Sequence, residues 1–594
     1  MGLGEVRMIS RGAAIGRRRS ACVITRAKRA LLSYNWPVAD EHVSRREWTF
    51  FLGGVLLLVL AVYAFSLQNG FVFWDDPDLV IDNPASHGVT IPNITTAFTT
   101  YDPDLYVPLT IISFQLNYAI SGLQPFLYHL TNILLHAGSA MLVGWVFFRI
   151  SGKKSVALLT AFLFAVHPIN VEAAAWVSAR KDVLSSFFFL LSLGSFLEWR
   201  GGRSSRWYVI SLVAFLCGLL SKVSILSLPL ILLLCDWLNH GRSGGHSSAM
   251  PLRMRSMIVD KIPFVILSIA FGIVSLFGKM GGTFSLFQKH LVGMKAALFS
   301  LWHLAAPVNY SVVYPFTGVP SITRPDLLVP LVIIISVIVV TFLYRKKFPA
   351  FFFSWWWFLL LIAPSFLTAE KGQDVVHVLY LTSDRYVYLA AISIFFLFAF
   401  HVQKAPRLAY PSGMLVVILA ALSTMQSLVW KDTETLLHHA LATTPDSAIV
   451  HNNLGAYYDS IGEPERAAAE YAAASTSDGG TADSWFNVGI AALREKRRDD
   501  AIVAFTRAVE LRPSFFFAHL NLGALLTDTG RIEEAVDHLL AAQKLDPGNL
   551  TVYLNLGIAL EKGGNTIDAR RAYERALVID PENAYAKERL AELK

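Results

Sequence analysis

Cysteine is scarce in this sequence, and its few copies are not spaced for any structural framework. Only Cys22, Cys217 and Cys235 occur among 594 residues, and the last two fall inside hydrophobic runs. This excludes small secreted domains held together by disulfides, and it excludes zinc sites built from cysteine pairs. P-loop, dinucleotide-binding and zinc motifs are missing too, so the sequence offers no soluble nucleotide-sugar site.

Charged residues are the second shortage. They make up 16% of the chain, whereas 54% of the residues are hydrophobic. A chain this apolar is typical of a polytopic membrane protein and not of a soluble one. A cleavable signal peptide is also missing, because the first apolar stretch begins near Trp48, too late and too long for one. We therefore interpret that stretch as a retained membrane span.

Much of the excess positive charge lies at the N-terminus. The net charge is +7, and residues 1–46 carry the basic side chains Arg7, Arg11, Arg17, Arg18, Arg19, Arg26, Lys28, Arg29, Arg45 and Arg46. A basic arm can bind nucleic acid, but one placed before a first hydrophobic span is more simply a cytoplasmic anchor. We predict a cytoplasmic segment over 1–46 and no nucleic-acid partner.

Hydrophobic runs suited to crossing a bilayer occupy residues 47–429. A transmembrane helix needs about 20 apolar residues. We predict about eleven spans, at 48–68, 126–148, 156–170, 183–199, 207–221, 223–238, 262–279, 326–344, 350–367, 386–402 and 408–428. Two shorter or more polar stretches, 107–121 and 289–306, are predicted to be helices in the plane of the interface.

Basic residues between these runs predict an orientation, because Lys and Arg are enriched in cytoplasmic loops. With the N-terminus inside, the loops expected inside are all basic: 149–154, 200–206, 242–261, 344–347 and 404–407. An odd number of spans then puts the C-terminus outside. That side is the periplasm for a bacterial inner membrane, or the lumen for the ER membrane of a eukaryote.

The sequence repeats itself beyond residue 430. Gly455, Gly489, Gly523 and Gly557 recur at a step of 34 residues, each after Asn-Leu or Asn-Val. Two further sets keep this step, Ala467, Ala501, Ala535 and Ala569, and Ala474, Ala508, Ala542 and Ala576, and Pro513, Pro547 and Pro581 close successive units. This is the helix–turn–helix period of the tetratricopeptide repeat (TPR). The predicted fold class is therefore all-α: a polytopic membrane helical bundle over 47–429, then a TPR α-solenoid over 430–594 with about four full repeats and part of another.

Equivalent asparagines on the first helix of each repeat are candidates for binding. Asn453, Asn487, Asn521 and Asn555 could form a ladder whose amides pair with the backbone of a bound peptide. We predict that the solenoid binds a polypeptide. A merely structural array is the alternative.

Adjacent carboxylates follow the first predicted span. The segment Phe71 to Asp78 contains Asp75 and Asp76, and two neighbouring acids at a membrane surface should leave one with a raised pKa. Such a group suits a general base, and the sequence does not separate the two. A solvated turn is the alternative.

The other outer loops add acids and cations. His167, Glu172, Arg180, Lys181 and Asp182 lie at the second outer loop, where ionisable groups are functional candidates and Arg matches phosphate oxygens. Snorkelling at span ends is the alternative for Lys181 and Asp182. Lys222 and Arg385, on further outer loops, are candidate phosphate ligands.

These segments together resemble a known family. The acidic pair, the His-Pro-x-x-x-Glu-Ala stretch with Arg-Lys-Asp, the Ser-Lys segment, residues 306–311, Asp384-Arg385-Tyr386 and the TPRs are similar to the transmembrane-and-TPR protein O-mannosyltransferases. Their membrane part is of the GT-C glycosyltransferase type. The short array resembles that of a prokaryotic relative. Val223 stands where the family would have an acidic residue after Lys222.

The resemblance implies a reaction. A sugar, with mannose as the implied one, passes from a polyprenyl- or dolichyl-phosphate carrier to Ser or Thr of a protein held by the TPRs. Asp75 or Asp76 takes the acceptor proton, and Arg180, Lys222 and Arg385 neutralise the leaving lipid phosphate. No cofactor and no metal site are predicted, with carboxylate-bound Mg²⁺ or Mn²⁺ as an open alternative. The competing classes are a non-enzymatic membrane scaffold for envelope or secretory proteins, and a transferase acting on a glycan or lipid.

Overall fold

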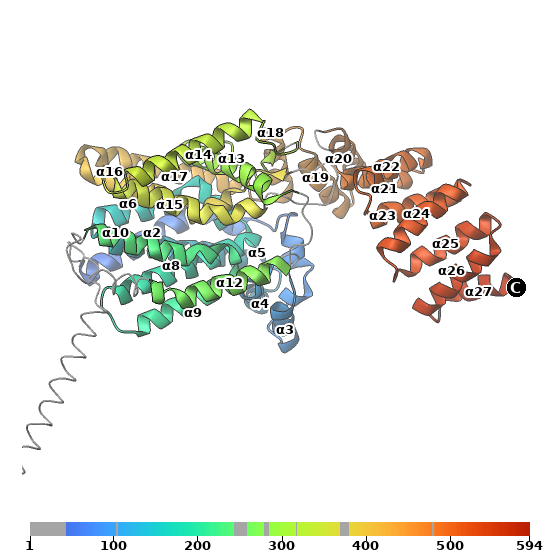
Figure 1. Ribbon diagram of the computed structural model, residues 1–594, viewed down its shortest axis with the longest axis horizontal. Helices are drawn as coiled ribbons and strands as arrows, with labels where there is room; N and C mark the ends of the chain where they lie inside the picture. Colours follow the sequence, from blue (N-terminus) through green and yellow to red (C-terminus); the bar gives the residue numbers. More distant parts are fainter. Residues whose placement is uncertain are drawn as a thin grey trace, which may run out of the picture.

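The protein is all-α, with a helical bundle at its N-terminal side and an α-solenoid at its C-terminal side (Figure 1). The computed structural model describes residues 43–101, 105–242, 258–277, 284–316, 318–368, 379–477 and 480–593. The basic segment predicted at 1–46 lies outside these residues up to position 42. The solenoid extends from one end of the bundle, and the chain ends at its far tip.

An α-helix overlaps each of the eleven segments predicted to span the membrane, of which residues 278–279 lie outside the described residues. These helices are α2 (Arg45–Val62), α5 (Pro125–Ser151), α6 (Lys154–Val166), α8 (Arg180–Arg200), α9 (Arg206–Ser221), α10 (Leu228–Arg242), α12 (Ile262–Phe277), α14 (Pro325–Leu343), α15 (Pro349–Ile362), α16 (Ala391–Lys404) and α17 (Ala409–Leu428). Five of the described helices are long and apolar enough to cross a bilayer, or six if one bent pair counts as a span. The number of eleven spans stays a prediction, since several of the other helices are shorter.

The bent pair brings polar residues into the end of the bundle. Helix α6 stops at Val166, because Pro168 cannot continue its hydrogen bonding, and a turn over Pro168–Asn170 leads into the short helix α7 (Val171–Ala175). The two parts are bent by 57°. The break folds Glu172 and the following Trp176 back over the bundle core.

The stretches predicted to lie in the interface are also helical, as α4 (Pro108–Ser121) and α13 (Leu286–Ala305). A third short helix, α3 (Ile91–Thr99), precedes α4. The one described strand pair, β1 (Pro315–Phe316) with β2 (Leu379–Tyr380), is antiparallel and was not predicted. It ties the segment after α13 to the segment before α16.

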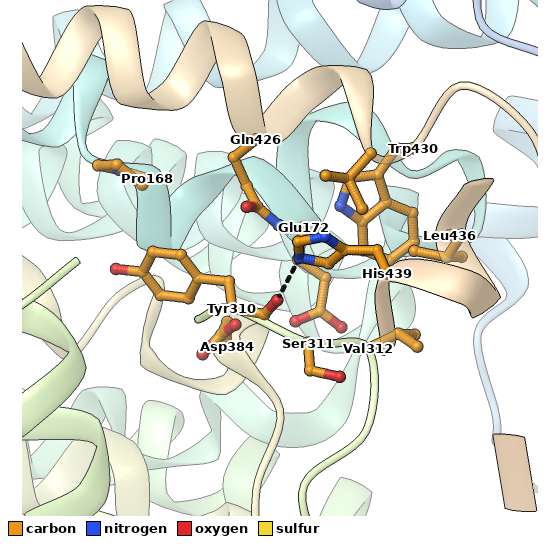
Figure 2. Close-up of a pocket in the computed structure, with 11 residues that line it drawn as sticks. Pro168, Glu172, Tyr310, Ser311, Val312, Asp384, Gln426, Trp430, Leu436 and His439 are labelled. Atoms are coloured by element: carbon orange, nitrogen blue, oxygen red, sulfur yellow. Dashed lines mark hydrogen bonds between the residues drawn. The ribbon is translucent and has the colours of Figure 1, made fainter. Parts of the chain in front are cut away.

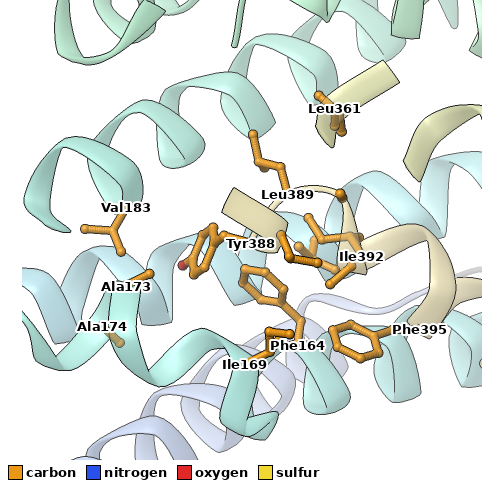
Figure 3. Packing of buried hydrophobic residues seen from close by; sticks show 14 of the residues in the cluster. Phe164, Ile169, Ala173, Ala174, Val183, Leu361, Tyr388, Leu389, Ile392 and Phe395 are labelled. Carbon is orange, nitrogen blue, oxygen red and sulfur yellow. The ribbon is translucent and has the colours of Figure 1, made fainter. Parts of the chain in front are cut away.

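The bundle core is aromatic and aliphatic (Figure 3). The rings of Tyr388 and Phe164 meet edge to face with centroids 4.8 Å apart, and His136 Nδ1 lies 2.7 Å from the Tyr388 hydroxyl. Small residues admit large neighbours, as in membrane helix packing, since a Cβ at Gly194 would collide with the Trp145 ring.

The solenoid consists of paired helices. They are α18 (Thr433–Thr443), α19 (Ala448–Ser460), α20 (Pro464–Thr476), α21 (Ala482–Arg494), α22 (Arg498–Leu511), α23 (Phe516–Asp528), α24 (Ile532–Leu545), α25 (Leu550–Lys562), α26 (Thr566–Ile579) and α27 (Ala584–Glu592). Added Cβ atoms at Gly455 and Gly523 would lie 2.6 Å from Tyr471 and Leu539 of the paired helix. These glycines therefore allow the two helices of a repeat to pack closely.

Candidate active site

Three acid–base pairs meet at the end of the bundle that carries the solenoid. Lys181 Nζ lies 3.2 Å from Asp75 Oδ2, and Lys222 Nζ lies 2.6 Å from Asp182 Oδ1. The Arg385 guanidinium pairs with the Glu172 carboxylate, whose second oxygen accepts the Arg385 main-chain N–H at 3.0 Å. Six of the predicted residues, from four separate segments, therefore come together.

Two aromatic rings join these pairs into one cluster. Lys181 Nζ and the Arg385 guanidinium carbon lie 5.8 and 5.0 Å from the Trp176 ring centroid. Lys222 Nζ and the Arg385 guanidinium carbon lie 5.3 and 5.1 Å from the Tyr386 ring centroid. Cations within about 6 Å of an aromatic centroid are attracted to the ring. We call the three pairs with Trp176 and Tyr386 the charged cluster.

The charged cluster contains polar atoms with no protein partner. Arg385 Nε, Trp176 Nε1 and Asp182 Oδ2 are buried and make no hydrogen bond to any residue that the structure describes. A buried donor or acceptor without a partner costs roughly 1–3 kcal/mol, so such atoms need an occupant. Two of the three are donors, and they would suit an anionic or hydroxyl-bearing ligand.

The structure distinguishes the two adjacent carboxylates. Asp76 is 1% exposed and accepts hydrogen bonds from Val72 N, Ser178 N and the Ser178 hydroxyl. Burial raises the pKa of Asp76 to about 6, although these hydrogen bonds lower it. The Asp75 charge adds a smaller increase. Asp75 has 31% of its side chain exposed and reaches Lys181. Asp76 therefore holds the loop in place, while Asp75 is the accessible carboxylate.

Arg180 points away from the charged cluster. Its guanidinium is fully buried, where it donates to the Asn132 side chain, to Ser113 Oγ at 3.1 Å, to Asn117 Oδ1 at 3.0 Å and to Tyr128 O at 2.8 Å. These bonds hold α4 and α5 against the start of α8. Phosphate binding by Arg180 stays a prediction, and the contacts seen here give it a positioning role.

His167 is likewise used inside the protein. Its Nδ1 accepts the Ile169 N–H at 3.2 Å, so Nε2 carries the proton and donates to Leu304 O at 3.1 Å. The ring thereby caps the turn after α6 and fixes the end of α13. Its predicted part in donor binding stays a prediction.

A second polar group, which was not predicted from the sequence, lies beside the charged cluster. Asp384 is buried, accepts a hydrogen bond from the Tyr314 hydroxyl at 2.8 Å and lies 3.5 Å from His303 Nδ1. Burial raises the pKa of Asp384. Its place beside Arg385 in the chain was the available signal, whereas Tyr314 and His303 had none.

A narrow pocket lies between the bundle and α18 (Figure 2). Glu172 and Asp384 form its acidic wall, Gln426 comes from the end of α17, Trp430 follows that helix, and His439 comes from α18. The solenoid therefore begins directly against the site.

The asparagine ladder is only partly free for a ligand. Asn453 and Asn521 donate from Nδ2 to the carbonyls of Ile449 and Phe517, each in its own helix, at 2.8 Å. Asn487 Nδ2 donates to Asn452 Oδ1 at 2.9 Å. The four residues of the ladder, Asn555 included, are half-buried. Peptide binding by the ladder stays a prediction.

The residues that the structure describes contain no group of three His, Cys, Asp or Glu side chains arranged to hold a metal ion. The charged cluster itself pairs each carboxylate with a cation, which leaves its acids poorly suited to a divalent ion.

Comparison with known proteins identifies the repeats and a set of relatives. Tetratricopeptide repeat models match residues 452–514, 489–549 and 551–583. The chain is 35% identical over 194 residues to protein O-mannosyl-transferase TMTC3 of Homo sapiens, a match covering 30% of this chain and 20% of the relative. The resemblance to the TMTC proteins is confirmed. A second relative, Tmtc1 of Drosophila melanogaster, is 28% identical over 195 residues, covering 32% of this chain and 23% of that protein.

The chain spans about a fifth of the length of the curated relatives that it matches. Among solved structures it is similar to YrrB, described as a TPR protein with an unusual peptide-binding site. That likeness has 20% identity and a TM-score of 0.24, and it covers 32% of this chain and 96% of YrrB.

Proposed function

We propose that this membrane protein is a glycosyltransferase that moves a sugar from a polyprenyl- or dolichyl-phosphate carrier to a Ser or Thr hydroxyl of a protein. Mannose is the proposed sugar, in line with the names of the relatives. The observation that carries the proposal is the partly exposed Asp75 carboxylate at the edge of a cluster with three cations. A site for hydroxyl activation beside a phosphate needs these two features.

In the proposed reaction, the acceptor hydroxyl oxygen bonds to the anomeric carbon of the sugar. The bond between that carbon and the carrier phosphate oxygen breaks, and the hydroxyl proton passes to Asp75. The departing lipid phosphate gains one negative charge. A general base of this kind contributes about 10²–10⁴-fold to the rate.

Lys222 and Arg385 are the proposed ligands of the departing phosphate. The unpartnered Arg385 Nε and Trp176 Nε1 can each donate a hydrogen bond, and the Lys222 ammonium has three N–H donors of which one reaches Asp182. Lys181 is proposed to hold Asp75 in its charged form, as a cation 3.2 Å away favours ionisation. The reaction as proposed uses no metal and no cofactor.

The solenoid is proposed to present the acceptor polypeptide. TPR arrays offer an extended concave surface, and this one begins at the site itself. The same proposal puts the site and the solenoid on the extracytoplasmic side. A reporter fused to the C-terminus should then report an extracytoplasmic location, and a cytoplasmic signal would contradict this orientation.

Transfer from a lipid-linked sugar tests the proposed function. Purified protein would be given mannosyl-phosphoryl-polyprenol and a Ser/Thr-rich peptide, and sugar transfer would be followed by mass spectrometry. Asp75→Asn should lower the rate at least about 10²-fold. The matched control is Asp78→Asn, which changes an exposed acid of the same loop and should leave transfer intact. Equal transfer by Asp75→Asn and the wild type would refute the role of Asp75. No transfer by folded wild-type protein would favour the scaffold alternative.

A further inference from the structure

The connection between α17 and α18 touches both halves of the site. We propose that Trp430 and Thr433, at this connection, are positioning residues of the active site, so the start of the solenoid supports the chemistry as well as presenting the acceptor. This inference rests on the proposed function. It adds that the solenoid and the membrane bundle form one catalytic unit.

Thr433 holds the acidic loop. Its hydroxyl accepts the main-chain N–H of Phe73 at 2.8 Å, two residues before Asp75. The neighbouring Lys431 carbonyl accepts the Gly70 N–H at 2.9 Å. Thr433 is 4% exposed, so the bond is shielded from water. The conformation that presents Asp75 is therefore set in part by residues far along the chain.

Trp430 supports the cationic half. Its ring stacks on Trp176 with centroids 5.5 Å apart and planes inclined by 24°. Trp176 in turn carries Lys181 and Arg385 against its ring. Trp430 is 3% exposed, and stacked aromatic pairs contribute about 0.5–1.5 kcal/mol beyond their burial. Displacing Trp430 would move the surface on which two of the three cations lie.

The start of the solenoid cannot move independently of the bundle. Leu436, Leu437 and Tyr458 belong to the same buried cluster as the bundle core. His439 Nε2 lies 3.0 Å from the Tyr310 carbonyl, across the pocket shown in Figure 2. An element fixed in this way can keep the geometry of a site constant, as supporting residues must.

The positioning role differs from acceptor presentation in one measurable way. An element that only presents the acceptor has no effect on sugar release to water, because that reaction needs no protein acceptor. An element that positions Asp75 and the cations affects transfer to protein and release to water alike. The two reactions, measured side by side on the full-length protein, separate these roles.

The test uses Thr433→Val, with Thr433→Ser as the conservative variant and Thr435→Val as a control at an exposed position of the same helix. Loss of the acceptor for the Phe73 N–H should speed hydrogen exchange at that amide about tenfold. The kcat for transfer to peptide and the rate of sugar release to water should fall together, by about tenfold, while the acceptor KM changes less than about twofold. Thr433→Ser and Thr435→Val should behave as the wild type.

Trp430→Leu, with Trp430→Phe as its conservative partner, gives a second, independent pair of variants for the same activity measurements. Either unchanged exchange at Phe73 or unchanged kcat in Thr433→Val would overturn the inference, and so would a loss confined to the acceptor KM. Hydrogen exchange can be measured without transferase activity, so a failure of the positioning proposal can be distinguished from a failure of the proposed function. A wild-type protein without transferase activity refutes the proposed function, whereas unchanged exchange in Thr433→Val refutes the positioning contact.

Discussion

The pair Glu172–Arg385 allows structural and functional roles to be separated by a double-mutant cycle. Both residues are nearly fully buried, at 4% and 6% exposed, and both Glu172 oxygens accept hydrogen bonds from Arg385. Glu172→Gln and Arg385→Gln each leave one buried charge without its partner. Removing one partner of a buried pair costs about 3–5 kcal/mol.

The double variant should be more stable than the sum of the two single losses. With both charges gone, no uncompensated charge stays buried, so a coupling energy of about 2–3 kcal/mol is expected. Thermal unfolding in detergent, under one set of conditions for all four proteins, gives the comparison.

Activity should not follow stability in this cycle. If Arg385 holds the departing phosphate, the double variant regains stability but stays about 10²-fold slower than the wild type in sugar transfer. Strictly additive stability losses would refute the buried pair. Recovery of transfer in the double variant would refute the phosphate role of Arg385.

Three further predictions concern the solenoid. Gly557→Ala should destabilise it by about 1–3 kcal/mol, measured by chemical unfolding of the C-terminal helices, because the new methyl would collide with the Tyr573 ring. His519 and His538 have their Nδ1 atoms 3.0 Å apart, and burial lowers the pKa of both. The two histidines therefore stabilise the folded solenoid above their ordinary pKa of about 6.5, and this stabilisation is lost as the pH falls below that value. His538→Asn should flatten the pH dependence of thermal unfolding. Asn521→Ala should raise the acceptor KM and leave sugar release to water unchanged, and an unchanged KM would refute the ladder.

The repeat architecture was predictable because its causes are local and periodic. A glycine facing the partner helix is needed once per repeat, and Pro513, Pro547 and Pro581 each follow the end of a second helix. The membrane helices were predictable for a similar reason, since long apolar runs identify them without knowledge of their neighbours. The number of helices that cross the membrane was harder to predict, because α9, α12 and α16 are short.

The sequence identified six of the residues that come together in the charged cluster, but not how they are arranged. Asp75 and Asp76 are adjacent, but Asp75 pairs with Lys181 whereas Asp76 accepts from Ser178, and both partners lie about a hundred positions away in the chain. Arg180 and Lys181 are also adjacent, but successive helical positions point about 100° apart, so one faces α4 and α5 and the other faces Asp75. The helical period could have excluded a shared direction for these two cations.

The aromatic contacts of the charged cluster could not be predicted from the sequence. Trp176 and Tyr386 gather three cations, yet an aromatic residue at a membrane boundary is ordinarily an interface anchor. The contact between Thr433 and Phe73 joins positions 360 residues apart, and no local pattern announces it.

The proposed glycosylation of protein hydroxyls depends on Asp75. The most direct measurement is a quantitative map of sugar-modified Ser and Thr peptides from cells lacking the gene, complemented with the wild type, Asp75→Asn or Asp78→Asn at equal protein levels. We expect a set of hexose-modified peptides that is present with the wild type and Asp78→Asn and lost with Asp75→Asn. The same map in all three would contradict this expectation.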